Sequence, residues 1–241
     1  MKLNEPITLR SAEIRNRIWL PPMCQYKCEN QDGLPGDWHM VHYGARAAGG
    51  FGLIIAEATG VTPEGRISPY CAGLWNDEQQ EAWARIVRFV HTRGATMGIQ
   101  LNHAGRKGSS YPMLPSFAGR RSVPLSDGGW ETVAPSPIAA HGHEEPRPLS
   151  TEEVRAVPGA FADAARRAVA AGFDLVEIHA AHGYLLHQFL SPLSNERSDE
   201  YGGSRENRAR LLLEVVEAVR AAIPGTMPLS VRISATEWLD P

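Results

Sequence analysis

The stretch Phe173-Asp-Leu-Val-Glu-Ile-His-Ala-Ala-His-Gly-Tyr184 is the strongest indication of the fold, because an apolar run leads directly into side chains that can donate or accept protons. The run Phe173–Ile178 is rich in β-forming residues, which predicts a buried strand. His179, His182 and Tyr184 then follow at the carboxyl end of that strand. In barrels of parallel strands the loops at this end converge on one mouth, where the chemistry is done.

The same unit recurs along the chain: a helical pattern ends at a glycine, and an apolar strand follows. This pattern predicts five strands, at Arg17–Leu20, Leu53–Ala58, Met97–Asn102, Phe173–Ile178 and Leu229–Ser234. It predicts helices near residues 38–48, 77–93, 151–171 and 205–222. Strands that alternate with helices and are apolar throughout indicate a parallel sheet covered by helices. We therefore predict an α/β fold, a (β/α)8 TIM barrel, of which this chain covers about the first five strand-helix units.

The chain is short for a closed barrel. Such a barrel usually takes about 250 residues or more, and this chain uses its 241 residues on five strands and four helices. We expect residues 1–241 to be the N-terminal part of a single barrel domain. Two open strand edges would then favour poor stability or aggregation.

Two stretches depart from the regular pattern. The segment from about 104 to 149 holds seven of the eighteen prolines and is predicted to be a long loop excursion after the third strand. Loops of that length are usually functional or mobile. Ser150-Thr-Glu-Glu153 is a capping-box pattern that opens a helix, but Pro158 lies inside this helix, which predicts a kink or a late start near Pro158.

The composition is typical of a globular enzyme rather than of a membrane or nucleic-acid-binding protein. The chain is 43% hydrophobic and 21% charged with a net charge of -3, and no apolar run is long enough to cross a bilayer. The first residues, Met1–Pro6, have no apolar signal core. Cys24, Cys28 and Cys71 suit a reducing compartment, and one C-x3-C pair gives only weak support for zinc. We expect a cytoplasmic protein.

Five motifs resemble the old yellow enzyme family, and together they run from about residue 5 to the end of the chain. They are Pro21-Pro-Met-Cys-Gln-Tyr26, Leu53-Ile-Ile-Ala-Glu-Ala58, Gly98-Ile-Gln-Leu-Asn-His-Ala-Gly-Arg106, His179-Ala-Ala-His-Gly-Tyr184 and Ser191–Arg208. Cys24 resembles the cysteine of the thermophilic-like and xenobiotic-reductase branch. The later strands of the family, which hold the flavin phosphate, are absent, so the phosphate-binding residues are expected beyond residue 241.

The resemblance implies a barrel that binds flavin mononucleotide (FMN) without a covalent bond. NADPH or NADH would reduce the flavin, which would then pass hydride to the β-carbon of an activated alkene such as an enone or nitroalkene. The flavin carries the hydride chemistry, and the protein supplies anchoring, polarisation and a proton. The partners implied are this small molecule and a second copy of the chain in a homo-oligomer, with no nucleic acid and no membrane.

The resemblance also assigns the substrate-facing residues. His179 and His182 match a pair that binds the substrate oxygen, an oxyanion-type role, and both would face one side if the chain turned helical there. Tyr184 matches the donor of a proton to the α-carbon, and a phenol with a pKa of about 10 is protonated at neutral pH. Tyr26 matches a residue that contacts the activating group from the far side. As an alternative, His179 and His182 would be core histidines bonded to backbone groups. The alternative for Tyr26 is a tyrosine that only packs at the strand end.

The cofactor-binding assignments come from the same resemblance. Gln100 matches the residue that pairs with the pyrimidine edge of the flavin, because an amide offers a donor and an acceptor. Arg232 matches the cation beside flavin N1 and O2, and Cys24 matches a cysteine that tunes the reduction potential. Further flavin contacts are expected from Pro21, Pro22, Met23 and Ala58. By sequence alone, these last residues and Cys24 would be ordinary core.

Three other functions remain open at this stage. One is a flavoprotein of the 2,4-dienoyl-CoA reductase type, which has the same barrel and an iron-sulfur cluster, although Cys24 and Tyr26 argue against it. Another is a metal-dependent barrel hydrolase that uses His103, His179 and His182, although no acidic ligand of recognisable spacing accompanies them. The last is an inactive fragment. We expect no metal site.

Overall fold

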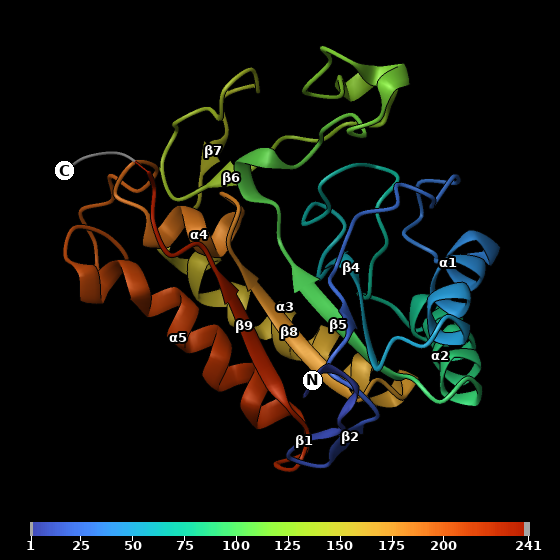
Figure 1. Ribbon diagram of the computed structural model, residues 1–241. Helices are drawn as coiled ribbons and strands as arrows, with labels where there is room; N and C mark the ends of the chain where they lie inside the picture. The colour runs from blue at the N-terminus through green and yellow to red at the C-terminus, as the bar shows by residue number, and fades with distance from the viewer. Residues whose placement is uncertain (1, 239–241) are drawn as a thin grey trace.

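A parallel sheet of five strands forms the centre of the computed structural model, which describes residues 2–238. The strands lie in the order β3 (Trp19–Leu20), β4 (Leu53–Gly60), β5 (Thr96–Asn102), β8 (Leu175–Ala180) and β9 (Leu229–Ile233). All neighbouring pairs are parallel. The five predicted strands are therefore confirmed, and the curved sheet that they form is half of a barrel (Figure 1).

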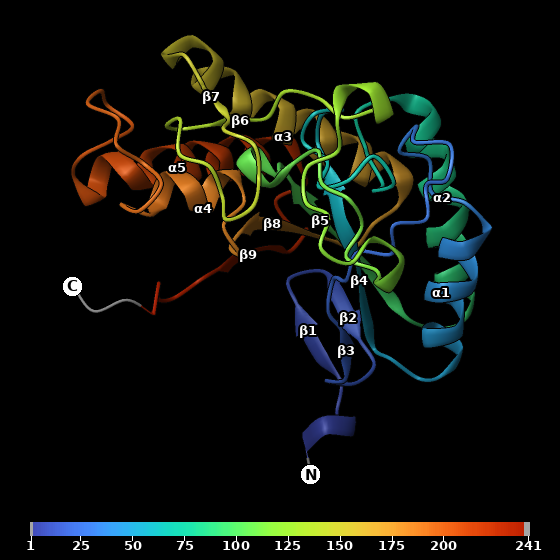
Figure 2. The same cartoon turned by 90° about the horizontal axis from the view of Figure 1, so that it is seen from above.

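Helices cover one face of this sheet and form an arc around it when the molecule is seen from above (Figure 2). They are α1 (Asp37–Ala48), α2 (Asp77–Thr92), α3 (Thr151–Ala171), the short α4 (Leu185–Leu190) and α5 (Arg205–Ala222). Strand residues such as Ile54, Ile99 and Val176 pack against helix residues such as Trp83 and Phe161 in the main core. Within residues 2–238 no helix combines the length and the apolar character that crossing a bilayer requires.

Helix α3 starts where its capping sequence predicts, and the expected late start at Pro158 is wrong. The Ser150 hydroxyl accepts a hydrogen bond from the Glu153 amide, and the Glu153 carboxylate accepts one from the Ser150 amide. The helix continues through Pro158 and ends at Ala171, and the capping residue Gly172 has a φ of 91°. The buried face of the helix, with Phe161 in the core, holds it together across the one hydrogen bond that proline removes.

A hairpin that the sequence patterns did not reveal lies under the sheet. Strands β1 (Ile7–Leu9) and β2 (Ala12–Ile14) pair antiparallel near the amino ends of the parallel strands (Figure 1). Ile14 packs in a separate cluster with Leu53, Ile55 and Leu175, the residues that face the inside of the half-barrel. The hairpin therefore covers the lower apolar end of the concave face. Its three-residue strands are too short for a recognisable alternation.

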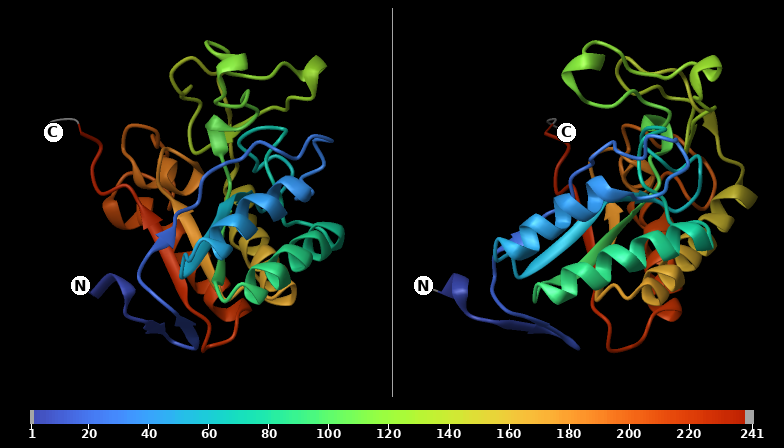
Figure 3. Two further views of the ribbon diagram at one scale, coloured as in Figure 1. Left: turned by 45° about the vertical axis from the view of Figure 1, so that its right-hand side comes forward. Right: turned by 90° about the vertical axis from the view of Figure 1, so that its right-hand side faces the viewer.

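The excursion after β5 stands over the carboxyl ends of the strands (Figure 3). It contains 3-10 turns at Gly105–Lys107, Pro115–Phe117 and Leu125–Asp127, and a short parallel pair of β6 (Val133–Ala134) and β7 (Arg147–Pro148). The strand end at Asn102 and the start of α3 fix its two ends. Its position makes the excursion one wall of the mouth of the half-barrel.

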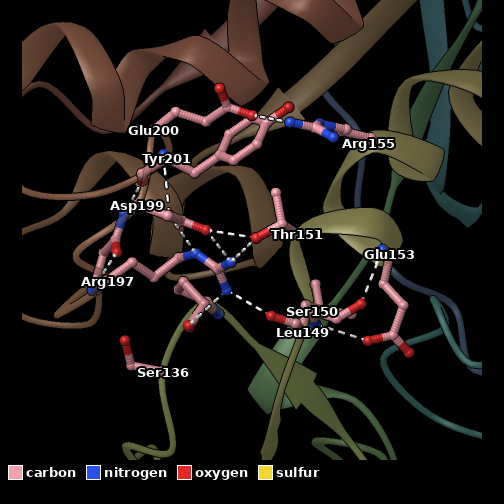
Figure 4. A network of polar contacts seen from close by, with 12 residues as sticks. Ser136, Leu149, Ser150, Thr151, Glu153, Arg155, Arg197, Asp199, Glu200 and Tyr201 are labelled. Carbon is pink, nitrogen blue, oxygen red and sulfur yellow. Dashed lines mark hydrogen bonds and ion pairs between the residues drawn. The ribbon is translucent and has the colours of Figure 1, made fainter.

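Arg197 ties the end of the excursion to the loop that precedes α5 (Figure 4). Its guanidinium group donates to the carbonyl oxygens of Pro135 and Leu149 and pairs with Asp199. Asp199 also accepts a hydrogen bond from the Thr151 hydroxyl at 2.8 Å. The segment between Asn195 and α5 therefore holds the excursion and α3 together, as a structural loop should.

Candidate active site

The carboxyl ends of the central strands bring predicted polar residues into neighbouring register positions. Gln100 on β5 lies opposite Ala58 on β4 and Glu177 on β8. His179 lies opposite Arg232 on β9. Residues in register on a parallel sheet lie side by side, so strands far apart in sequence place these groups at one edge.

Glu177 is the member of this group that sequence reasoning missed. It accepts a 2.7 Å hydrogen bond from Gln100 Nε2 and a 3.4 Å bond from the Ser230 hydroxyl. Burial raises the pKa of Glu177, and the Gln100 bond and the charge of Arg232 partly offset this rise. The apolar run from Phe173 hid Glu177, although a carboxylate inside such a run was itself a clue to a polar partner.

Gln100 and Arg232 could hold the pyrimidine edge of a flavin. The Gln100 side chain is buried, and because its Nε2 donates to Glu177, its amide oxygen is the group left to accept a bond. Arg232 is half-buried, and within residues 2–238 it makes no ion pair at contact distance. An acceptor beside an unpaired cation matches a ring edge that carries both an N–H group and oxygens that become negative on reduction.

The two predicted histidines touch through a left-handed turn, and not through a helical turn, which would also have placed them on one side. His182 has a φ of 57° and Gly183 one of 74°, and this turn separates β8 from α4. His182 Nδ1 lies 3.3 Å from His179 Nε2, and the ring centroids are 5.0 Å apart. The turn thus brings together rings that a strand would point to opposite faces.

Hydrogen bonds fix which nitrogen of each ring carries the proton. The Ala181 amide donates to His179 Nδ1 at 3.2 Å, so the neutral His179 ring carries its proton on Nε2, towards His182 Nδ1. The His182 proton is then on Nε2, where it can be donated to a ligand. Burial, with the charges of His182 and Arg232, lowers the pKa of His179 to about 3. His179 is therefore neutral at physiological pH.

Tyr184 and Tyr26 lie in one small cluster with Cys24, next to the buried residues Ala58 and Cys71. The Tyr184 ring meets the His179 ring edge-on at 4.9 Å. Burial raises the pKa of both tyrosine hydroxyls well above the usual value. Both phenols are therefore fully protonated and able to donate.

Cys24 has a neighbour that no spacing rule could have found. Its thiol interacts with that of Cys71, which follows β4 by more than ten residues and is fully buried. This contact, together with burial, raises the pKa of Cys24 well above its usual value. Cys24 is therefore a neutral thiol and not a nucleophilic thiolate.

A buried carboxylate positions the loop that carries Cys24 and Tyr26. Glu57 lies in a β-bulge of β4, between Ala56 and Ala58, and is fully buried. Its carboxylate accepts a 2.9 Å hydrogen bond from the Gln25 amide and lies 3.1 Å from His39 Nε2. Tyr26, the next residue after Gln25, has a φ of 54°, so the loop is held in a conformation that needs such support.

The remaining predicted residues lie at or near the same mouth. Pro21, Pro22 and Met23 form the loop after β3, and the Met23 side chain is 47% exposed. Their contact with a flavin stays a prediction.

His103 does not join a metal site. Its Nδ1 accepts a 3.1 Å bond from the Gly105 amide, and burial lowers its pKa to about 4. In the described part of the chain no three His, Cys, Asp or Glu residues lie close enough to hold a metal ion. Residues 2–238 therefore contain no ligand set for the metal-dependent hydrolase.

Comparison with known proteins identifies relatives along the whole chain. A sequence model described as the NADH:flavin oxidoreductase / NADH oxidase family matches residues 2–241. An NADH:flavin oxidoreductase from Gibberella zeae is 47% identical over 99% of this chain and 58% of the relative. An NADPH dehydrogenase from Geobacillus thermodenitrificans is 47% identical over 98% of this chain and 64% of the relative.

Solved structures agree with these relatives. Morphinone reductase superposes with a TM-score of 0.82 at 34% identity, over 96% of this chain and 61% of that protein. The old yellow enzyme homologue from Zymomonas mobilis superposes with a TM-score of 0.81 at 37% identity, over 97% and 63%. The chain thus spans less than two thirds of the length of these relatives.

Proposed function

The chain belongs to the NADH:flavin oxidoreductase / NADH oxidase family, and we propose that the whole protein is an NAD(P)H-dependent ene-reductase with FMN as its cofactor. Relatives named NADPH dehydrogenase and a neighbour solved with tetrahydroNAD support the nicotinamide reductant. The proposed substrate is an activated alkene such as an enone or nitroalkene. FMN, when bound, would supply the transfer of hydride from NAD(P)H to the β-carbon of this alkene.

Gln100 and Arg232 are the proposed anchors of the flavin. Gln100 would accept from the ring N–H through its amide oxygen, since the bond from its amide nitrogen to Glu177 fixes the orientation of the amide. Arg232 would stabilise the negative charge of the reduced ring, since a guanidinium group stays charged at all relevant pH values. Ala58, Cys24, Pro21, Pro22 and Met23 are proposed to contact the ring, and Cys24 to tune its potential as a neutral, polarizable thiol.

His182 is proposed to bind the substrate oxygen, and His179 to hold His182 in position. The neutral His182 ring has its Nε2 proton free, and His179 holds it in that tautomer. A hydrogen bond from His182 would withdraw electron density from the alkene and stabilise the oxygen as it becomes negative. Tyr26 would contact the activating group from the other side.

Tyr184 is the proposed proton donor to the α-carbon. The observation that carries the proposal is its place beside the histidine pair, with its ring 4.9 Å from that of His179 and a hydroxyl whose raised pKa keeps it protonated. A neighbouring oxygen site and proton source suit the reduction of a polarised double bond.

The test is Tyr184→Phe in the flavin-loaded protein. We expect reduction of 2-cyclohexenone to slow by up to about 10²- to 10⁴-fold, the range of acid-base catalysis, while flavin reduction by NADPH stays near normal. Anaerobic stopped-flow absorbance measures the two half-reactions separately. Tyr201→Phe, which removes a hydroxyl bonded to Glu214, is the matched control.

The outcomes of this test are distinct. Unchanged enone reduction in Tyr184→Phe would remove Tyr184 from this role, and a protein that stays colourless after flavin addition would reject the function itself. A cytoplasmic location and a homo-oligomeric state belong to the same proposal, and light scattering of the purified protein tests the latter.

A further inference from the structure

A cavity of about 810 Å³ opens between Tyr184 and the excursion after β5. The function proposed above uses only Tyr184 of its lining. Four cationic side chains line it, those of Arg106, Lys107, Arg120 and Arg121, together with His141 and His143. Neither Asp nor Glu is among its lining residues in the described chain. This excess of positive charge favours the binding of an anion in the cavity.

The cations of this cavity lack carboxylate partners. Across residues 2–238, Arg106, Lys107, Arg120 and Arg121 make no ion pair at contact distance, whereas ten other basic residues do. Arg106 donates to the Ile138 carbonyl at 2.8 Å, but its buried Nε has no partner. A buried N–H group without a partner is costly, which points to a ligand that accepts from it.

Lys107 is held at the inner end of the cavity. Its Nζ donates to the carbonyl of His182 at 2.7 Å, next to the histidine pair. Burial and the charge of Arg106 lower the pKa of Lys107, and burial lowers that of Arg106 despite the carboxylate of Glu237 nearby. An anion in the cavity would relieve both effects.

The outer wall combines aromatic rings with a guanidinium group. Tyr111 and Phe117 stack with ring centroids 5.5 Å apart, and the Arg120 guanidinium carbon lies 5.2 Å from the Tyr111 centroid. Arg121 lines the same cavity and is exposed. The wall therefore offers apolar flat surfaces and free positive charge together.

We propose that this cavity is an anion subsite, which binds a phosphate or carboxylate group of a ligand whose other end reaches Tyr184. Arg106 and Lys107 form its inner end, and Arg120 and Arg121 its outer end. The anion has two possible sources: the phosphates of the nicotinamide nucleotide, or an acid group on the alkene substrate. The assignment of the ligand's reacting end to Tyr184 rests on the proposed function. The assignment of the anion subsite does not.

The first experiment distinguishes the two sources with the double variant Arg120→Ala/Arg121→Ala in the flavin-loaded protein. NADPH is compared with 1-benzyl-1,4-dihydronicotinamide, which has no phosphate, and 4-oxopent-2-enoate with its uncharged methyl ester. We expect the apparent Kd of one anionic ligand to rise about tenfold, as two exposed ion pairs are lost. The Kd of its uncharged counterpart should change less than twofold. A selective loss of affinity for NADPH would identify the nucleotide phosphates as the bound anion. A selective loss of affinity for 4-oxopent-2-enoate would identify the acid group of the substrate.

A second readout needs no turnover. Isothermal titration calorimetry should show the same weakening for the corresponding anion, either NADP⁺ or 4-oxopent-2-enoate. Arg120→Lys/Arg121→Lys should restore most of that affinity. Arg88→Ala on α2, which removes an exposed arginine outside the cavity, is the matched control. Added salt should weaken binding to the wild type more than to the alanine double variant.

Equal calorimetric affinity of the wild type and the alanine double variant for both anions would overturn the subsite. Equal losses for charged and uncharged ligands would also overturn it, because they would indicate a damaged wall and not a lost charge. If flavin binding or alkene reduction fails altogether, the proposed function fails, and the calorimetric comparison still decides the subsite.

Discussion

His182 takes a backbone conformation that costs energy for a residue with a side chain. Its φ of 57° lies in the left-handed region, which disfavours most residues by about 1–2 kcal/mol and asparagine less. The Lys107 ammonium group stabilises this conformation by donating a hydrogen bond to the His182 carbonyl oxygen. The histidine pair therefore depends on a strained turn, as is common at functional sites.

Substitution of His182 tests the turn and the donor together. We expect His182→Ala to slow enone reduction about 10²- to 10³-fold, the usual effect of removing one oxyanion donor. In His182→Asn the new residue tolerates the left-handed turn and still has a donor, although a shorter one. The rate of enone reduction should therefore fall less than in His182→Ala. Half-reaction kinetics measure both, and equal rates in the wild type and the alanine variant would contradict the role.

The neutral state of His179 makes the stability of the protein depend on pH. Its folded pKa of about 3 lies below the unfolded value of about 6.5. Between these values the unfolded chain binds a proton that the folded chain does not, so the free energy of unfolding falls as the pH falls below about 6.5. The slope is at most about 1.4 kcal/mol per pH unit for one histidine, and His103 adds an effect of the same sign.

Urea unfolding at pH 7, 6 and 5 measures this slope. His179→Asn should reduce it, and His141→Asn, at an exposed position, should leave it unchanged. A wild-type slope of zero would show that His179 is accessible to protons in the folded protein.

At the scale of elements, the bulge of β4 decides the position of the site loop. The extra residue Glu57 leaves its amide outside the ladder, and the Tyr43 hydroxyl accepts a bond from that amide at 3.0 Å. The carboxylate then reaches the Gln25 amide on the neighbouring loop. Bulges often redirect a side chain in this way beside active sites.

Glu57→Ala should lower the free energy of unfolding by about 2–4 kcal/mol, because the Gln25 amide and the Tyr43 hydroxyl lose a buried partner. Glu57→Gln keeps an acceptor and should cost much less. Chemical denaturation measures both, with Glu217→Ala on the exposed side of α5 as the control. If Glu57→Ala lowered the free energy of unfolding no more than Glu217→Ala does, water would be replacing the carboxylate as a hydrogen-bond partner.

At the scale of the whole molecule, the sheet is open. Strand β9 lies at one edge, and its Ile233 side chain is 58% exposed. An exposed apolar edge strand is a template for pairing with another copy.

Ile233→Lys should therefore reduce self-association of residues 1–241 several-fold. Val41→Lys, at an exposed position of α1, is the control that adds the same charge away from an edge. Light scattering against concentration measures both variants. An equal effect of the two would assign the change to net charge rather than to the edge.

Local sequence patterns were enough to predict the parallel sheet and the four long helices that cover it. Apolar runs between glycine caps and capping serines such as Ser150 and Ser204 act locally, so their signals are contained within about twenty residues. The motifs at the strand ends also pointed to the residues of the site. Their placement at one mouth followed because parallel strands share one carboxyl edge.

The interactions between these residues became visible only in the folded molecule. The hydrogen bond between Gln100 and Glu177, the contact of Cys24 with Cys71 and the burial of Glu57 under His39 each join positions far apart in sequence. The left-handed turn at His182, the passage of α3 through Pro158 and the hairpin beneath the sheet depend on packing that outweighs local preference. Local patterns encode backbone conformation, but hydrogen-bond partners, pKa values and cavities depend on the distances that folding creates.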